Sequence, residues 1–316
     1  MARASSSSAA PPAPVSPEPG GRSGAALLLE SLRPEQWSKN FLVFAGLLFG
    51  HRLTSPEAAL KAVLAFVVFC ALSGAVYLLN DIADRAGDRN HPLKRRRPIA
   101  SGALSPKSAG AAGVVLGLGG VLLASLVSPA LGLTAAAYLL LLALYSIVLK
   151  HIVILDVLAI SAGFVLRAVA GAVAVAVPIS QWLIVCTTLL ALFLALSKRR
   201  HELTLLADGA AEHRRILGEY SPYLLDQMIA VVTASTLMAY CFYAISPETA
   251  VRVGTTRLGA TIPFVLYGIF RYLYLVHQKR GGGSPAELLL ADKPLLTCVG
   301  LWTLSVVLIL YSPLGQ

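Results

Sequence analysis

Charged residues are scarce in this chain. They make up 13% of its 316 residues, against roughly 25% in a typical soluble domain. Apolar residues make up 56%, and the mean hydropathy of +0.72 leaves too little polar surface to cover a water-facing globule. This composition excludes an ordinary soluble enzyme and favours an integral membrane protein.

Paired cysteines and acidic residues are also in short supply. Cys70, Cys186, Cys241 and Cys298 stand far apart in apolar runs, so neither a CxxC metal site nor a disulfide framework is expected. There are 16 Asp and Glu against 26 Lys and Arg, which gives a net charge of +10. In a membrane protein such an excess sets orientation or binds anionic substrates, so we expect no nucleic-acid partner.

Nine apolar stretches approach the length of about 20 residues that a membrane-spanning helix needs. They cover approximately residues 37–53, 58–80, 109–127, 131–150, 152–177, 181–197, 223–245, 258–276 and 294–311. Residues 1–24 are rich in Ser, Ala, Pro and Gly without apolar periodicity, which predicts a disordered tail. The predicted fold class is all-α, a polytopic membrane protein with a bundle of about nine transmembrane helices over residues 25–316.

The positive charges predict how this bundle is oriented. If the N-terminus is cytoplasmic, 21 of the 26 Lys and Arg residues fall on the cytoplasmic side, four fall on the other side, and Arg167 lies inside a helix. Cytoplasmic loops of membrane proteins carry such an excess of Lys and Arg. The split supports both the number of spans and a cytoplasmic N-terminus.

A polar face is predicted at the cytoplasmic end of the second span. If the helix continues far enough, an arc of about 100° gathers Tyr77, Asn80, Asp81, Asp84 and Asp88. Clustered carboxylates repel one another unless a cation lies between them, and oxygen ligands favour Mg²⁺ that also binds substrate phosphates. The alternative is a solvated helix end whose acids are offset by Arg85 and Arg89.

Several cations stand where phosphates could meet them. The basic run 94–97 is either a topology signal and lipid contact or a phosphate site, with Lys94 the preferred ligand. Arg167 is deep in the fifth span, on the same helix side as Asp156. An ionisable group at that depth usually faces the bundle interior, so Arg167 either serves function or forms a structural pair with a carboxylate. Lys39 either contacts lipid headgroups or points a charge at the site, and the cluster 198–202, which includes Lys198, either serves topology and solubility or binds substrate.

These groups together predict a Mg²⁺ and diphosphate site that lipid can reach at the cytoplasmic face. A transferase that joins a phosphorylated polar donor to a lipid acceptor is the natural reaction class. A membrane transporter is the alternative from another class, although it would not need the acidic face, the basic run and the buried arginine at one site.

The pattern Asn80-Asp81-x-x-Asp84-x-x-x-Asp88-Arg89 resembles the first aspartate motif of the UbiA superfamily of intramembrane prenyltransferases. The resemblance covers about residues 30–316. Residues 32–40, residues 91–102 and Asp156 with residues 163–167 resemble the superfamily's decaprenyl-phosphate phosphoribosyltransferase branch. This resemblance implies transfer of 5-phosphoribose from 5-phosphoribosyl 1-diphosphate to a polyprenyl (decaprenyl) phosphate, with release of diphosphate. The product would be the lipid-linked precursor of cell-wall arabinan.

The resemblance also implies roles for particular residues. Asn80 and Asp84 would bind Mg²⁺, with Asp81, Asp84 and Asp88 as the catalytic carboxylates. Donor phosphates and ribose would contact Lys39, Tyr77, Lys94, Lys150 and Arg167. Tyr145 and Asp156 would contact the ribose or support the residues that do. Lys198 would also bind substrate. The enzyme would lie in the bacterial plasma membrane, with its active site at the cytoplasmic face; a homo-oligomer is left open.

One departure from the superfamily pattern bears on the donor. Aromatic prenyltransferases of the superfamily carry a second aspartate-rich motif between the sixth and seventh helices, where this chain has Lys198, Arg199, Arg200 and Glu202, followed by an isolated Asp208. A second carboxylate-bound metal is therefore not expected, and cations suit a phosphate-rich sugar donor. An aromatic or quinone-pathway prenyltransferase remains the alternative enzyme.

Overall fold

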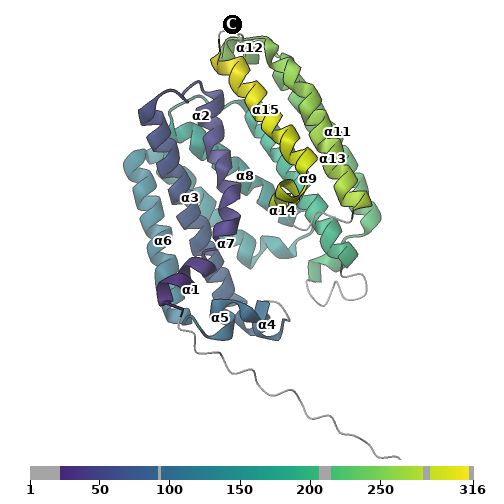
Figure 1. The fold of residues 1–316 in the computed structure, drawn as a ribbon. Coiled ribbons are helices and arrows are strands. Elements are labelled where there is room, and N and C mark those ends of the chain that lie inside the picture. Colours follow the sequence, from purple (N-terminus) through teal and green to yellow (C-terminus); the bar gives the residue numbers. More distant parts are fainter. Residues whose placement is uncertain (1–21, 92–93, 206–214, 280–284, 313–316) are drawn as a thin grey trace, which may run out of the picture.

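The computed structural model describes residues 22–91, 94–205, 215–279 and 285–312, and throughout these ranges the regular structure is helical, with no strand. Figure 1 shows long helices running side by side. The predicted all-α class is therefore confirmed. The predicted tail lies almost entirely outside the described residues, and a short helix, α1 (Gly24–Ser31), begins where that tail was expected to end.

Eight helices of the described chain are long and apolar enough to cross a membrane. Four begin with a Ser N-cap followed by Pro, a pairing that satisfies a free N–H and presets the first turn. The eight long helices are α3 (Pro56–Ala83), α6 (Pro106–Val127), α7 (Pro129–Ile147), α8 (Leu155–Ala174), α9 (Gln181–Leu205), α11 (Pro222–Ile245), α13 (Ile262–Gln278) and α15 (Lys293–Tyr311).

The first predicted span has a different structure from the other eight. It consists of a 3-10 helix, η1 (Pro34–Phe44), that continues into the short α2 (Ala45–Phe49). A 3-10 helix rises about 2.0 Å per residue and an α-helix about 1.5 Å, so the two elements together extend for about 30 Å. The segment is therefore as long as a bilayer core is thick, although it is not a continuous α-helix.

Two glycines allow η1 and α2 to pack directly against α8. A Cβ atom on Gly171 would lie 1.8 Å from the Val43 carbonyl oxygen, and one on Gly46 would lie 2.6 Å from the Ala172 nitrogen. No side chain fits at either position without moving the backbone. The close approach brings residues of η1 against the middle of α8.

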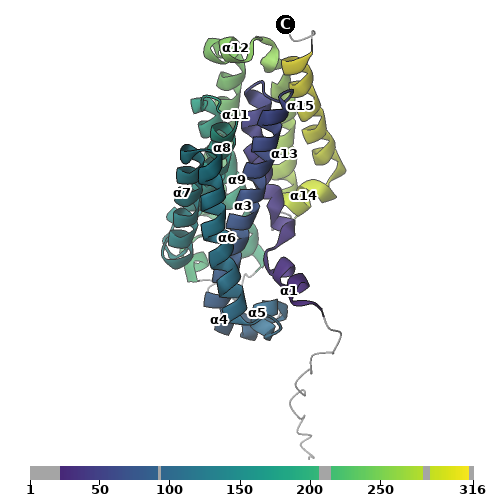
Figure 2. The same cartoon turned by 90° about the vertical axis from the view of Figure 1, so that its left-hand side faces the viewer.

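Short elements lie at the two ends of the bundle. In Figures 1 and 2, α1, α4 (Arg85–Asn90) and α5 (Pro98–Ser101) lie at the lower end, whereas α12 (Pro247–Val253) lies beside the C-terminus at the upper end. The remaining short elements are η2 (Lys94–Arg96), η3 (Leu149–His151), η4 (Arg215–Glu219), η5 (Arg257–Thr261) and α14 (Pro285–Ala291). The lower end carries the acid motif and the basic run.

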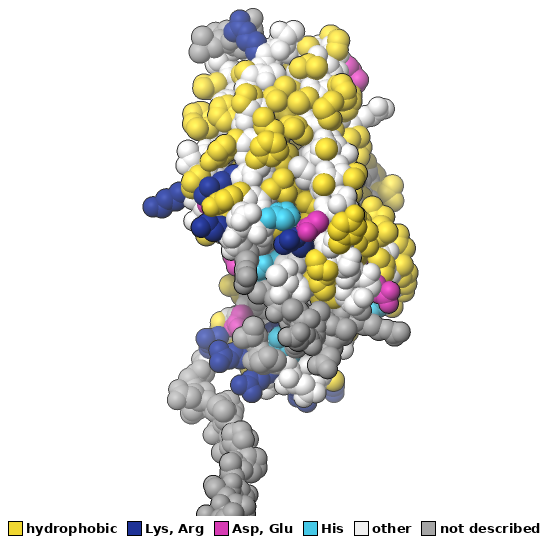
Figure 3. All heavy atoms as spheres, turned by 90° about the vertical axis from the view of Figure 1, so that its right-hand side faces the viewer, with side chains coloured by type: hydrophobic (Ala, Val, Ile, Leu, Met, Phe, Trp, Pro, Cys, Tyr) yellow, Lys and Arg dark blue, Asp and Glu magenta, His cyan; other side chains and the backbone are white. Residues whose placement is uncertain are grey.

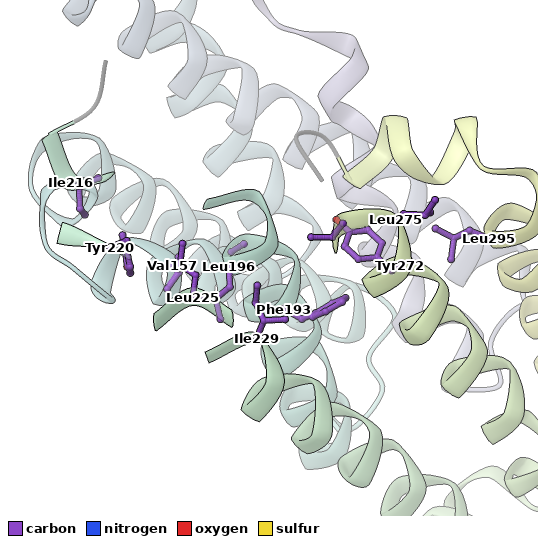
Figure 4. Packing of buried hydrophobic residues seen from close by; sticks show 12 residues of the cluster. Val157, Phe193, Leu196, Ile216, Tyr220, Leu225, Ile229, Tyr272, Leu275 and Leu295 are labelled. Carbon is purple, nitrogen blue, oxygen red and sulfur yellow. The ribbon is translucent and has the colours of Figure 1, made fainter. Parts of the chain in front are cut away.

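The long helices form two packed groups. One contains α3, α6, α7 and α8 with η1, and the other contains α9, α11, α13 and α15; α8 packs on α9 and joins them. Figure 4 shows the core at this junction, where Val157 of α8, Phe193 of α9 and Ile229 of α11 continue toward Tyr272 of α13.

The outer surface is mainly apolar. Leu118, Leu126 and Leu133 are each more than two-thirds exposed. On the face in Figure 3, hydrophobic side chains cover most of the upper part, while most charged side chains gather nearer the lower end. Exposed side chains of this kind require lipid as their solvent, so the protein is a multi-pass membrane protein.

Candidate functional site

A cavity of about 1280 Å³ lies between the two helix groups. Its apolar wall includes Phe41, Phe44, Phe49, Trp182, Phe264 and Trp302, and its polar wall includes Lys39, Tyr77, Asn80, Tyr145, Arg167, Lys198 and Arg199. Six residues predicted for the site therefore meet on one cavity wall. A cavity that is polar in one part and apolar in the other suits a molecule with a charged head and a hydrocarbon tail.

The predicted metal ligands lie where α3 ends. Asp84 follows the last residue of α3, and its N–H donates to the Asn80 carbonyl oxygen at 2.8 Å. The Asn80 side chain lines the cavity. The Asp84 side chain is 52% exposed, and Lys150 Nζ lies 3.8 Å from Asp84 Oδ1. Lys150, from η3, thus reaches the acid motif although it does not line the cavity.

The other two carboxylates of the motif are held by arginines from elsewhere in the chain. Arg33 Nη2 donates to Asp81 Oδ1 at 2.5 Å. Arg97 Nη1 donates to Asp81 Oδ1 at 3.1 Å and to Asp88 Oδ2 at 2.7 Å. Asp81 and Asp88 are both buried. Their negative charges therefore anchor the start of η1, where Arg33 lies, and the basic run to the end of α3.

The solvated helix end considered as an alternative is not what the structure shows. Arg85 and Arg89 do not offset the acids; their Nε atoms donate to the carbonyl oxygens of Ile99 and Ala100. The pairing arginines, Arg33 and Arg97, lie 48 and 9 residues from their partners Asp81 and Asp88 in sequence. Helical spacing along the sequence therefore did not predict either of these two ion pairs.

The donor set at this end suits Mg²⁺. Within the described ranges, no group of three or more His, Cys, Asp or Glu side chains comes together, so the protein alone forms no complete cage. Asn80 and Asp84 stand one helical turn apart as oxygen donors. Mg²⁺ is usually bound by one or two carboxylates, waters and substrate phosphates, which matches this incomplete set.

Asp156 lies outside the cavity lining and is fully buried. Its Oδ2 accepts from Arg199 Nε at 2.8 Å and its Oδ1 accepts from the Tyr220 hydroxyl at 2.7 Å. Burial, together with this hydrogen bond, raises the pKa of Tyr220 to about 12. Both Asp156 oxygens are thus occupied by protein groups, and one of them holds the Arg199 guanidinium in place.

The sequence analysis gave Arg199 no role in the site, although this residue lies on the cavity wall. It is 2% exposed and lines the cavity. Its Nη1 donates to Glu202 Oε2 at 2.5 Å, and its Nη2 lies 3.5 Å from the Tyr145 hydroxyl. The Glu202 carboxylate is also 3.9 Å from Lys198 Nζ. This end of α9 therefore presents neutralised acids rather than a second metal site.

Arg167 is buried on the cavity wall with neutral partners. Its Nε donates to Asn40 Oδ1 at 2.7 Å, Nη1 to the Gly163 carbonyl oxygen at 3.0 Å, and Nη2 to the Tyr138 hydroxyl at 2.5 Å. The guanidinium also lies over the Tyr138 ring at 4.8 Å. The structural pair with a carboxylate, considered from the sequence, does not occur within the described chain.

The remaining predicted cations differ in their positions. Lys39 lines the cavity, whereas Lys94 is exposed in η2 and does not. Tyr77 lies on the cavity wall with the Arg33 guanidinium 4.6 Å from its ring centre. Of the basic run, it is Arg97 rather than Lys94 that joins the acid motif.

The fold and the cavity define a polytopic helical membrane protein with an amphiphilic cavity beside an aspartate motif. A model of the UbiA prenyltransferase family matches residues 40–291. The chain therefore belongs to the UbiA prenyltransferase family.

Two relatives carry the same name. The decaprenyl-phosphate phosphoribosyltransferase of Corynebacterium glutamicum is 32% identical over 289 residues, with 90% of this chain and 86% of the relative covered. The enzyme of that name from Mycobacterium tuberculosis is 33% identical, with 88% and 92% covered.

A solved structure shares the fold. The UbiA homolog of Archaeoglobus fulgidus bound to GPP and Mg²⁺ gives a TM-score of 0.70 at 18% identity, with 89% of this chain and 99% of that chain covered. The arrangement of the helices is therefore that of the family, and a homolog with this fold holds a divalent cation.

Proposed function

We propose that the protein transfers 5-phosphoribose from 5-phosphoribosyl 1-diphosphate to a polyprenyl phosphate, of which decaprenyl phosphate is the form in the relatives' names. The observation that carries the proposal is the cavity, whose polar wall includes Asn80, one helical turn before Asp84, and whose remaining wall is apolar. A water-soluble phosphorylated donor fits the first part and a lipid tail the second.

The reaction forms one bond and breaks one at the anomeric carbon of ribose. An oxygen of the lipid phosphate attacks this carbon, and the bond to the diphosphate oxygen breaks with its electron pair. Because the attacking phosphate is already anionic, no general base is needed, which agrees with a cavity lining that includes no histidine among the described residues.

Asn80 and Asp84 would hold Mg²⁺ on the donor diphosphate, and Mg²⁺ would neutralise the charge that develops on the leaving group. Lys150 lies beside Asp84 and would bind the same phosphates. Asp81 and Asp88 would act through Arg33 and Arg97, which they keep at this end of the cavity.

The paired acids Asp156 of α8 and Glu202 of α9 support a sugar donor over a prenyl diphosphate. Glu202 is shared by Arg199 and Lys198, and Asp156 is taken by Arg199. No carboxylate pair in the described part of this wall is free to hold a second metal. An aromatic prenyltransferase of the superfamily would need one there, and a transporter would need no metal–phosphate site.

The positive-inside pattern supports a cytoplasmic position for the acid-motif end of the bundle, and the bacterial relatives support a location in the plasma membrane. The donor is water-soluble and would enter from that side. The lipid phosphate would approach within the membrane.

The test is a transfer assay with purified protein in polyprenyl phosphate vesicles containing Mg²⁺ and labelled 5-phosphoribosyl 1-diphosphate. We expect labelled lipid and released diphosphate in equal amounts, and no turnover with EDTA. No labelled lipid, with activity instead on a prenyl diphosphate and an aromatic acid, would replace this function by the alternative one.

A further inference from the structure

Arg167 is a cavity-wall cation that lies far along its helix. It is twelve residues into α8, so its Cα is about 18 Å along the helix from Leu155. The side chain turns back toward the start of α8, because Nη1 reaches the Gly163 carbonyl oxygen. The guanidinium thus lies between the acid-motif end of the cavity and the apolar wall.

The guanidinium has unused donors. Arginine carries five N–H groups, and the hydrogen bonds to Asn40, Gly163 and Tyr138 use three of them. Two N–H groups remain on a side chain that is 6% exposed and lines the cavity. A buried cation with neutral partners is costly unless an anion completes its environment.

Lys39 adds a second positive charge near this position. Its Nζ makes no hydrogen bond or ion pair with any residue that the structure describes, and Lys39 lines the cavity together with the cations Arg167 and Lys198. Repulsion among these cations falls when an anion binds between them. This part of the wall is therefore built to receive negative charge.

The position of the two cations matches the lipid phosphate better than the donor. Arg167 Nε donates to Asn40 Oδ1, and the Asn40 amide nitrogen donates to Ser73 Oγ at 3.5 Å. Ser73 is eleven residues, or about 16 Å, deeper along α3 than Asp84. That separation leaves room for a ribose between two phosphates. Beyond Lys39 the wall continues with Phe41 and Phe44, which suit a hydrocarbon chain and not a second hydrophilic group.

We propose that Arg167 and Lys39 bind the phosphate of the lipid acceptor, at a site separate from the donor diphosphate site at Asn80 and Asp84. The inference rests on the proposed function and moves both residues from the donor, to which the family resemblance assigned them, to the acceptor. In the transfer step the bound phosphate oxygen forms the bond to the anomeric carbon while diphosphate leaves at the other site, and no proton moves.

A binding assay tests the proposal without any turnover. Polyprenyl phosphate and the uncharged polyprenol of equal length are compared on the full-length protein in nanodiscs. We expect the phosphate to bind wild-type protein at least tenfold more tightly than the alcohol. Arg167→Gln and Lys39→Ala should each reduce this preference to less than threefold, whereas Lys107→Ala, which changes an exposed lysine outside the cavity lining, should leave it unchanged.

Steady-state kinetics provide the second arm. Arg167→Gln should raise KM for polyprenyl phosphate at least tenfold while KM for the donor stays within twofold. A rise in donor KM instead, or an undiminished preference for phosphate over alcohol in both variants, would overturn the proposal. If Arg167→Gln does not fold, judged by its melting temperature, Lys39→Ala decides. A wild-type protein without transfer activity would refute the proposed reaction, and the binding arm would still decide the acceptor site.

Discussion

The acid motif and the deep part of the polar wall balance their charges in opposite ways. At the rim beside the cavity, which comprises Asp81, Asp84 and Asp88 with Arg33 and Arg97, two of the three carboxylates are paired with arginine. At the deep wall, Arg167 meets only neutral partners and Lys39 none among the described residues. The rim therefore suits a metal–phosphate complex whose charges largely cancel, while the deep wall suits a bare anion.

The largest effect is expected from a substitution that removes the charge of Asp84, the half-exposed carboxylate of the rim. Asp84→Asn should lower kcat by about a thousandfold or more, because a metal-bound leaving group loses its charge stabilisation. Since the side chain is 52% exposed, the melting temperature should stay close to that of wild type. Transfer assays across a Mg²⁺ titration measure the loss, with Glu248→Gln at the other end of the bundle as the control. Activity above a tenth of wild type would remove Asp84 from the metal site.

A second prediction concerns Asp156, whose carboxylate is paired with the buried guanidinium of Arg199. Asp156→Asn leaves the buried Arg199 with one acidic partner fewer, and breaking such a pair costs about 3–5 kcal/mol. Thermal and denaturant unfolding in detergent should both report the loss. A stability equal to wild type would mean that Glu202 alone satisfies Arg199.

A third prediction addresses the backbone contact that supports the deep wall. Gly171→Ala places a Cβ against the Val43 carbonyl oxygen and should destabilise the protein by about 1–3 kcal/mol through overpacking. It should also weaken binding of polyprenyl phosphate, because η1 carries Asn40 and Lys39. Gly119→Ala is a matched control in a helix where nothing lies within 4 Å, and it should be neutral or slightly stabilising. Equal melting temperatures for the two variants would contradict a close η1–α8 contact.

The sequence predicted the parts of this architecture that depend on local pattern. Eight long helices follow from apolar runs, and the Asn80–Asp84 turn follows from helical spacing. The close packing of η1 against α8 was not predictable, because the contact between Val43 and Gly171 joins residues 128 positions apart in the sequence.

Pairings between distant charges were also beyond sequence reasoning. Asp156 has its partner 43 residues away in Arg199, and Asp81 has Arg33 48 residues away. A charge pattern shows which side chains are ionised but not which of them neutralise one another. For that reason Lys94 was preferred in the basic run, although in the described structure it is Arg97 that pairs with the acids.

The smallest effect is expected from a substitution that changes the hydrogen bonds holding Asp156, the partner of Arg199, but leaves all charges in place. Tyr220→Phe removes one hydrogen bond to Asp156 but leaves the carboxylate and the Arg199 pair in place, so the cost should be about 0.5–1.5 kcal/mol. The Ile154 N–H also loses the Tyr220 oxygen, which it contacts at 2.8 Å, and this loss sets the upper part of the range. Because the wall keeps its charges, the preference for polyprenyl phosphate over polyprenol should persist in this variant. Loss of that preference, measured in the same nanodisc assay, would show that the position of Arg199 and not the charge of Arg167 controls binding at the deep wall.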